Sequence, residues 1–320
     1  MSEIKTFSEF RARRFLKEQL MRPVKAGRIV HAQLFSGPEG TGKHTAALLV
    51  ARSMNCTGTG EKPCNACPSC LQFLSGNSPN LIEIKPDKNL IRIGAVRDDI
   101  LKKISLRPDT GKLFILINEA DKMNENAQNA LLKTLEEAPE YAAFILITDK
   151  PGALLPTIRS RCALYRFAPL NEEETAEILI QNGVDDEKAV LEAQSAEGSP
   201  GRAISRIKSE AYQELLKRAI SALESIRKKS DVAAAFSKIE QDKESGNEIL
   251  GIYEFYARRM MRGEMGENKR LQGGKLLESV IYAKKQLKAN VAYQSVMEIL
   301  FFDAASQEET NHGNGNRRPF

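Results

Sequence analysis

The stretch AQLFSGPEGTGK, residues 32–43, decides the fold. A short apolar run is followed by a glycine-rich segment and then by the helix formers of residues 45–54. Strand, glycine-rich loop and helix, in this order, are the context of a phosphate-binding loop, in which backbone N–H groups and a helix N-terminus face an anion. The candidate nucleotide-binding residues are Gly37, Gly40, Gly42, Lys43 and Thr45.

Two departures affect the position that would bind a metal ion. The full pattern ends in Ser or Thr, whose hydroxyl binds Mg²⁺, but here that position is His44. The strand 113–117 should end in Asp, and it ends in Asn118-Glu119. Imidazole and amide groups are poor replacements at a hard cation, so Glu119 is interpreted as vestigial and Thr45 as an uncertain substitute. Efficient hydrolysis is not expected, whereas nucleotide binding stays open because the glycines and Lys43 remain.

Apolar runs and helical patterns alternate up to Pro169, after which strand-like runs are absent. This alternation predicts a parallel α/β sheet covered on both faces, followed by an all-α region. The expected strands cover 32–35, 81–84, 113–117, 143–148 and 163–167. The expected domains are an α/β domain over 1–168, a helical lid over 169–208, a helical domain over 209–306 and a disordered tail over 307–320. Residues 1–30 are predicted to form an amphipathic helix, and 262–274 a loop.

Four of the five cysteines lie within fifteen positions, among glycines and prolines that favour tight turns. Four thiolates are the ligand set of a structural zinc ion, and the spacing predicts such a site. Disulfides are disfavoured in a reducing cytosol, and the lack of a redox partner motif disfavours an iron–sulfur cluster. The predicted zinc ligands are Cys56, Cys64, Cys67 and Cys70.

Composition and charge bound the possible environments. The 320 residues carry 47 Lys and Arg against 42 Asp and Glu, a net charge of +5 that permits nearby nucleic acid without requiring a DNA-wrapping surface. No run approaches the roughly 20 apolar residues of a membrane span. The charged first 17 residues do not resemble a secretory signal. We therefore expect a cytoplasmic protein with no membrane partner.

An arginine follows the fourth predicted strand, in the sequence LPTIRSRC of residues 155–162. Such an arginine can complete the ATP site of a neighbouring subunit as an arginine finger. The alternative is a surface arginine paired with a carboxylate, and the residues alone favour this second interpretation.

Several motifs in order resemble one family. GPEGTGK (37–43), the four-cysteine module after the first helix of the α/β domain, NALLKTLEEAP (129–139) and Ser160-Arg161-Cys162 together resemble bacterial clamp loader subunits, which are AAA+ ATPases. Among these, the chain is most similar to the delta-prime subunits of DNA polymerase III. The resemblance covers about residues 10–208, and the C-terminal helices match the family's collar only in length and helical character.

The resemblance implies an AAA+ fold with lid and collar, in a ring-like hetero-oligomer. The implied partners are the gamma/tau motor and delta subunits and, through the complex, the sliding clamp and primer–template DNA. It makes Arg161 the trans-acting finger and places Thr148 and Arg202 at the two sensor positions. The chain would be a component of a DNA-directed DNA polymerase holoenzyme, a nucleotidyltransferase as a complex, without being an efficient ATPase itself.

Two other functions are weighed against this one. An active gamma/tau-like motor should carry Ser or Thr after Lys43 and Asp at position 118, so ATP turnover by the purified chain would identify it. A DNA-binding adaptor built on the zinc module should be basic and aromatic. Residues 56–70 hold one basic residue, Lys62, and no aromatic residue, and a salt-dependent DNA-binding assay would test this alternative.

Overall fold

The computed structural model describes residues 6–314, which form two compact units. The first unit comprises residues 1–203 and the second residues 204–320, and each is described here by itself. The finer domain boundaries at 168, 208 and 306 stay predictions.

A five-stranded parallel sheet forms the centre of the first unit, with the order β2-β3-β4-β1-β5. This architecture confirms the predicted α/β fold. The central strands β3 and β4 are buried along their whole length, which explains why their sequences are continuous apolar runs. The strands are β1 (Ala32–Ser36), β2 (Leu81–Ile84), β3 (Leu113–Ile117), β4 (Ala142–Thr148) and β5 (Ala163–Arg166).

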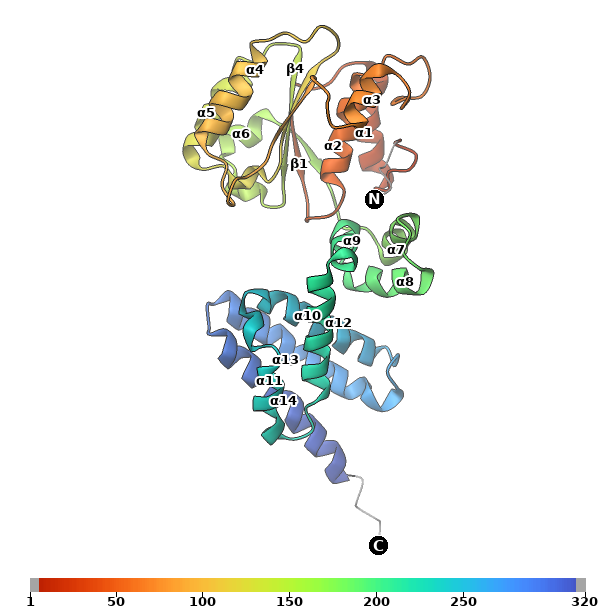
Figure 1. Cartoon of the computed structure of the whole chain (residues 1–320), viewed down its shortest axis with the longest axis vertical. Helices are drawn as coiled ribbons and strands as arrows, with labels where there is room; N and C mark the ends of the chain where they lie inside the picture. Colours follow the sequence, from red (N-terminus) through yellow and green to blue (C-terminus); the bar gives the residue numbers. More distant parts are fainter. Residues whose placement is uncertain (1–5, 315–320) are drawn as a thin grey trace. The chain divides into compact units, whose positions relative to one another are not determined.

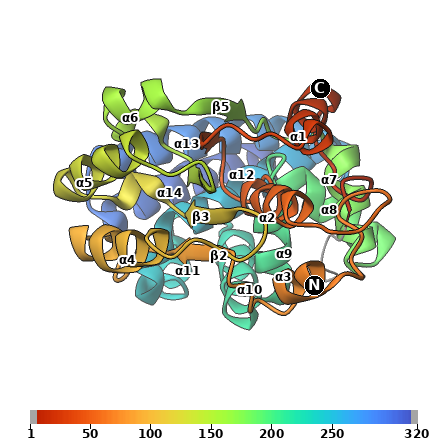
Figure 2. The ribbon, with the colours of Figure 1, turned by 90° about the horizontal axis from the view of Figure 1, so that it is seen from above.

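Helices cover both faces of this sheet (Figures 1 and 2). Along β3 the side chains alternate, so that Phe114 packs in one hydrophobic core and Ile115 in the other. One face carries α1 (Arg14–Ala26), α2 (Lys43–Met54) and α3 (Pro68–Leu74). The other carries the π-helix η1 (Ala95–Leu101), α4 (Lys102–Ile104), α5 (Glu125–Glu136) and α6 (Pro156–Arg161). Two short 3₁₀ turns follow β3 and β4, η2 (Ala120–Lys122) and η3 (Pro151–Ala153).

Three helices follow the sheet, and the third of them contains the boundary between the two units. They are α7 (Glu172–Gln181), α8 (Asp186–Ser195) and α9 (Pro200–Lys208). Helix α7 begins with a capping box, in which the Asn171 side chain accepts from the Glu174 backbone and the Glu174 carboxylate accepts from the Asn171 backbone. The helices α7 and α8 pack against each other.

The described part of the second unit, through Asn314, contains helices and no strands, as the sequence predicts. Its core includes the fully buried Tyr253, whose hydroxyl donates to the Ala219 carbonyl, and the hydroxyl of Tyr293 donates likewise to Ile239. The α-helices are α10 (Glu210–Glu224), α11 (Val232–Ser237), α12 (Gly246–Met261), α13 (Arg270–Lys288) and α14 (Tyr293–Asn314). Three 3₁₀ turns join them, η4 (Lys229–Asp231), η5 (Glu240–Ser245) and η6 (Glu267–Lys269).

Three local predictions differ from the structure. The amphipathic helix expected over residues 1–30 is limited to α1, because Phe7 and Phe10 are buried in a non-helical segment before it. Helix α13 begins inside the loop expected over 262–274, where Gly273 packs against α12 with its missing Cβ only 2.7 Å from the Ala257 carbonyl oxygen. Glycine therefore serves close helix packing at this position, and it does not mark a loop.

The tail expected to be disordered over 307–320 is helical through Asn314. Gln and Glu at 307–309 are good helix formers, so a polar composition alone did not predict the helix end. Residues 1–5 and 315–320, on which parts of these predictions fall, lie outside the described residues.

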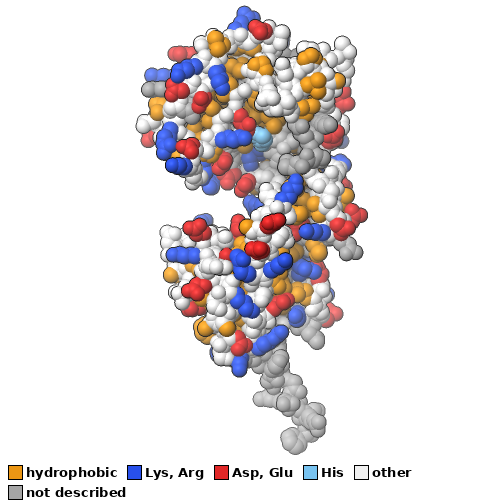
Figure 3. Space-filling view, in the orientation of Figure 1, with side chains coloured by type: hydrophobic (Ala, Val, Ile, Leu, Met, Phe, Trp, Pro, Cys, Tyr) orange, Lys and Arg blue, Asp and Glu red, His pale blue; other side chains and the backbone are white. Residues whose placement is uncertain are grey.

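No helix among residues 6–314 is long and apolar enough to cross a membrane. On the face drawn in Figure 3, basic and acidic side chains are interspersed over both units. This mixture agrees with the modest net charge of +5 and gives that face no extended basic patch of the kind that binds nucleic acid.

Candidate functional site

The phosphate loop lies between β1 and α2, as its motif predicts, and its lysine is turned inward. The Lys43 ammonium donates to the carbonyl oxygens of Gly37, at 2.5 Å, and Pro38, at 2.6 Å. Its residue is only 7% exposed. Burial lowers the pKa of Lys43, and the nearby carboxylates of Asp149, Glu39 and Asp121 oppose that effect. The ammonium therefore has two protein acceptors within the loop itself.

The glycines of the loop are required by close packing. A Cβ on Gly37 would lie 2.0 Å from the Phe167 carbonyl oxygen. Gly40 has a φ of +73°, and its Cβ would lie 2.3 Å from the Ser199 hydroxyl. Gly42, in the left-handed region at φ +85°, immediately precedes α2. The predicted loop residues are thus brought together, and each glycine has a steric reason.

Ser199, immediately before α9, and Gly201, in its first turn, each form one hydrogen bond with this loop. The buried Ser199 hydroxyl donates to the Glu39 carbonyl at 2.5 Å, and the Gly201 N–H donates to the Gly40 carbonyl at 2.9 Å. Arg202, predicted at a sensor position, forms an ion pair of 3.5 Å with Glu197. The backbone of the loop is therefore hydrogen-bonded to residues at the start of α9, whereas Arg202 is paired with the nearby Glu197.

The two residues that depart from the metal-binding pattern meet at one carboxylate. Nε2 of His44, at the start of α2, lies 2.6 Å from Oε1 of Glu83 on β2. The Asn118 amide, at the end of β3, donates to the same oxygen at 2.6 Å. The hydrogen bond from His44 lowers the pKa of Glu83 to about 2, because it outweighs the effect of burial, which raises this pKa. Lys85 lies 3.4 Å from the other carboxylate oxygen.

Sequence reasoning missed Glu83, although a signal was present. Its strand reads Leu-Ile-Glu-Ile, and a carboxylate within a short apolar strand needs a partner. Parallel pairing of β2 with β3 brings Glu83 beside Leu116, two residues before Asn118. The topology therefore could have placed this carboxylate beside the altered metal position.

The remaining predicted site residues have different surroundings. The Thr148 hydroxyl, 1% exposed, donates to Asp121 at 2.6 Å and accepts from the Lys150 N–H at 2.9 Å. Glu119 is exposed and adopts φ +47° before η2. Thr45 is half-buried in the first turn of α2. Thr148, predicted at a sensor position, is thus hydrogen-bonded to a carboxylate of its own chain.

Arg161 ends α6 and lies at the surface, with 40% of its side chain exposed. Its guanidinium lies 2.5 Å from Oε1 of Glu136, the last residue of α5, and donates to the Thr157 carbonyl at 3.1 Å. These two contacts place the guanidinium next to the end of α5. The ion pair with Glu136 is exposed and therefore contributes little to stability in water.

The four predicted cysteine ligands converge. All four sulfur atoms lie within 4.8 Å of one another. The backbone N–H of Cys64 donates to Cys56 Sγ at 3.3 Å, and that of Cys67 to Cys64 Sγ at 3.3 Å. Cys67 also caps α3 by accepting from the Cys70 N–H. Such a cluster can bind a metal ion.

The thiol groups of this cluster have unequal acidities. Burial raises the pKa of Cys67, but hydrogen bonds from the Cys70 backbone and from Thr57 outweigh this effect and lower the pKa to about 5. Backbone hydrogen bonds from Ala66 and Cys67 lower the pKa of Cys64. Burial raises the pKa of Cys70 to about 12, so this thiol in particular needs a cation to ionise. Cys162 lies outside the cluster, at the end of α6.

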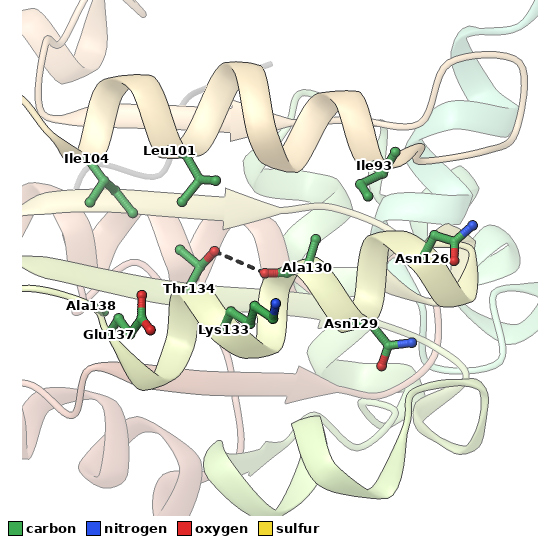
Figure 4. A pocket seen from close by; sticks show the side chains of 10 residues that line it. All are labelled: Ile93, Leu101, Ile104, Asn126, Asn129, Ala130, Lys133, Thr134, Glu137 and Ala138. Carbon is green, nitrogen blue, oxygen red and sulfur yellow. Dashed lines mark hydrogen bonds between the residues drawn. The ribbon is translucent and has the colours of Figure 1, made fainter.

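A pocket of about 470 Å³ lies away from these residues, between the η1–α4 segment and α5 (Figure 4). Leu101 and Ile104 line one side of it, and Asn129 and Lys133 lie on α5 opposite them. None of the residues predicted for the nucleotide, metal or finger sites lines this pocket.

Sequence comparisons with known proteins find DNA polymerase III subunits. The sequence model of the family described as "DNA polymerase III, delta subunit" matches residues 12–171. The delta' subunit of DNA polymerase III from Bacillus subtilis is 30% identical over 88% of this chain and 92% of its own length. The tau subunit from Escherichia coli is 35% identical over 62% of this chain, but the match covers only 32% of tau.

A solved structure supports the fold. The gamma subunit-related protein from Thermotoga maritima superposes with a TM-score of 0.51 at 19% identity, covering 91% of this chain and 99% of that one. At this identity the likeness concerns the fold alone.

Proposed function

The chain belongs to the delta-prime family of DNA polymerase III subunits, and from this premise we propose that it is a non-hydrolysing subunit of a clamp loader. In this role it assembles with gamma/tau-type motor subunits and a delta subunit. The complex opens a sliding clamp and closes it around primer–template DNA. The chain's own contribution is a fixed framework and one catalytic arginine given to a neighbour.

The observation that carries the proposal is the placement of Arg161. Its side chain lies at the surface on α6, where it is accessible to another chain, and its two partners are Glu136 and the Thr157 carbonyl. A guanidinium that reaches the phosphates of a neighbouring ATP stabilises the charge that develops in phosphoryl transfer. Hydrolysis in the neighbour then depends on correct contact between the subunits.

The cysteine cluster fits a structural role beside this function. Cys56, Cys64, Cys67 and Cys70 would hold a zinc ion with no ligand position left for substrate. The ion would join the segment after α2 to the first turn of α3. Residues 56–70 carry Lys62 as their one basic residue, which disfavours the DNA-binding adaptor.

The proposal is tested by reconstituting the complete clamp loader with wild-type chain or with Arg161→Ala. We expect clamp- and DNA-stimulated ATP hydrolysis to fall about tenfold or more if the stimulated turnover uses this finger, because one guanidinium at the transition state contributes several kcal/mol. Steady-state phosphate release measures this rate. Size-exclusion chromatography of both complexes establishes that assembly is intact.

Arg159→Ala is the matched control, because Arg159 is exposed on the same helix. Its complex should hydrolyse ATP at the wild-type rate. Equal rates for the Arg161→Ala and wild-type complexes would overturn the finger assignment. ATP turnover by the purified chain alone, abolished by Lys43→Ala, would instead identify the motor alternative.

A further inference from the structure

A working phosphate loop uses Mg²⁺ to connect three groups. The ion binds the hydroxyl after the loop lysine, the nucleotide phosphates and, directly or through water, a carboxylate at the end of the neighbouring strand. Its ligands must therefore be oxygen acceptors. In this chain the two protein positions hold His44 and Asn118, and both supply an N–H group to the same atom, Glu83 Oε1, at 2.6 Å each. These residues do not fit Mg²⁺.

We infer that His44, Glu83 and Asn118 form a hydrogen-bonded bridge that takes over the connecting role of the divalent cation. The bridge joins the start of α2, strand β2 and the end of β3 through protein atoms alone. One carboxylate oxygen lies between the two residues whose counterparts would flank the ion. The inference goes beyond the proposed function, because it concerns how this chain's own loop is held.

The charges around the loop agree with this replacement. Where a working phosphate loop holds a cation of charge +2, this chain holds the carboxylate of Glu83. The Glu83 side chain is only 25% exposed. Lys85 lies 3.4 Å from its second oxygen, and Lys43 is turned toward the loop carbonyls. The carboxylates of Glu39, Asp121 and Asp149 also act on the Lys43 ammonium. A triphosphate without its metal ion would therefore meet negative charge on this side.

The inference predicts that the loop region is stable without Mg²⁺ or nucleotide, and that its stability depends on Glu83. Thermal unfolding of the full chain tests this, with wild type, Glu83→Ala and Glu83→Gln each measured with ATP in two buffers, one containing EDTA and the other millimolar Mg²⁺. We expect Glu83→Ala to lower the unfolding temperature by about 4–8 °C, because it leaves two N–H groups without their acceptor. The decrease should be the same in both buffers.

Glu83→Gln retains an acceptor oxygen without the charge, so it should give a smaller decrease and folds even where the alanine variant does not. Lys85→Gln is the matched control: Lys85 is 66% exposed and lies 3.4 Å from the other carboxylate oxygen. An exposed pair of this kind is worth little in water, so this variant should lower the unfolding temperature much less than Glu83→Ala. An unchanged unfolding temperature in both Glu83 variants would overturn the bridge. So would a wild-type unfolding temperature several degrees higher with Mg²⁺ and ATP than with ATP and EDTA.

This experiment uses the chain alone and measures unfolding. The finger assignment is tested by hydrolysis in the complete complex. Failure of one therefore leaves the other standing.

Discussion

The cysteine module (residues 56–70) and the phosphate loop (residues 37–43) are both regions where the sequence pattern is associated with a metal ion. They differ in whether their side chains balance one another's charge and hydrogen bonds without an ion. The module gathers four sulfur ligands whose ionised forms repel one another unless a cation lies between them. The altered metal position beside the loop gathers two N–H groups around one carboxylate oxygen, which is a balanced set. The balance of donors, acceptors and charge, more than the presence of a motif, indicates whether a cluster needs a metal ion.

The largest expected effect would come from removing one ligand of the module. Cys67→Ser should abolish stoichiometric zinc binding and lower the free energy of unfolding by about 3 kcal/mol or more, because three remaining thiolates bind zinc poorly and the segment before α3 loses its anchor. Metal content by mass spectrometry and thermal unfolding of the full chain measure both. Cys162→Ser is the control and should retain zinc. A Cys67→Ser chain with full zinc and unchanged stability would remove the contrast between the two regions.

A smaller effect is expected from the ionisation of Glu83. Its pKa is lowered to about 2 in the folded chain, from 4.5, so its ionised form adds stability above pH 4.5 that is lost as the pH falls toward 2. The free energy of unfolding of wild type should exceed that of Glu83→Gln by about 1.5 kcal/mol at neutral pH. This difference should shrink below pH 4.5. Urea unfolding at a series of pH values measures it. A difference that is independent of pH would show that charge plays no part in the bridge.

The smallest effect tests the packing inside the module. A Cβ on Gly58 would lie 2.8 Å from both Cβ and Sγ of Cys64, whereas a Cβ on Gly60 would have no atom within 4 Å. Gly58→Ala should therefore weaken zinc binding about tenfold, equivalent to about 1.4 kcal/mol, and Gly60→Ala should leave it unchanged. Competition with a chromogenic chelator gives both affinities. Equal affinities in the two variants would mean that the ligands adjust freely.

Much of the first unit could be predicted from the sequence because its strands are continuous apolar runs and its turns carry glycine. The five strands and the convergence of the cysteines follow from such local signals. The partners of individual side chains do not. Glu83 meets His44 and Asn118 only because β2 pairs with β3, and Ser199 reaches Glu39 across 160 positions of sequence.

Helix ends were also beyond local reasoning. Gly273 lies inside α13 because α12 approaches closely there, a contact that composition does not reveal.

Arg161 was predicted as a finger through the resemblance, while its ion pair with Glu136 depends on the packing of α5 and α6. That residue's role in a neighbouring site stays a prediction.

The hydrogen bonds that join the phosphate loop to the start of α9 bear on how sequences of this kind are interpreted. Gly37 faces the Phe167 carbonyl, and Gly40 and Gly201 approach so closely that a Cβ on Gly201 would lie 2.8 Å from the Gly40 Cα. These contacts would penalise any larger residue even if no nucleotide ever bound. Packing alone can therefore account for these glycines, and their presence is evidence for the architecture of the loop without being evidence for nucleotide hydrolysis.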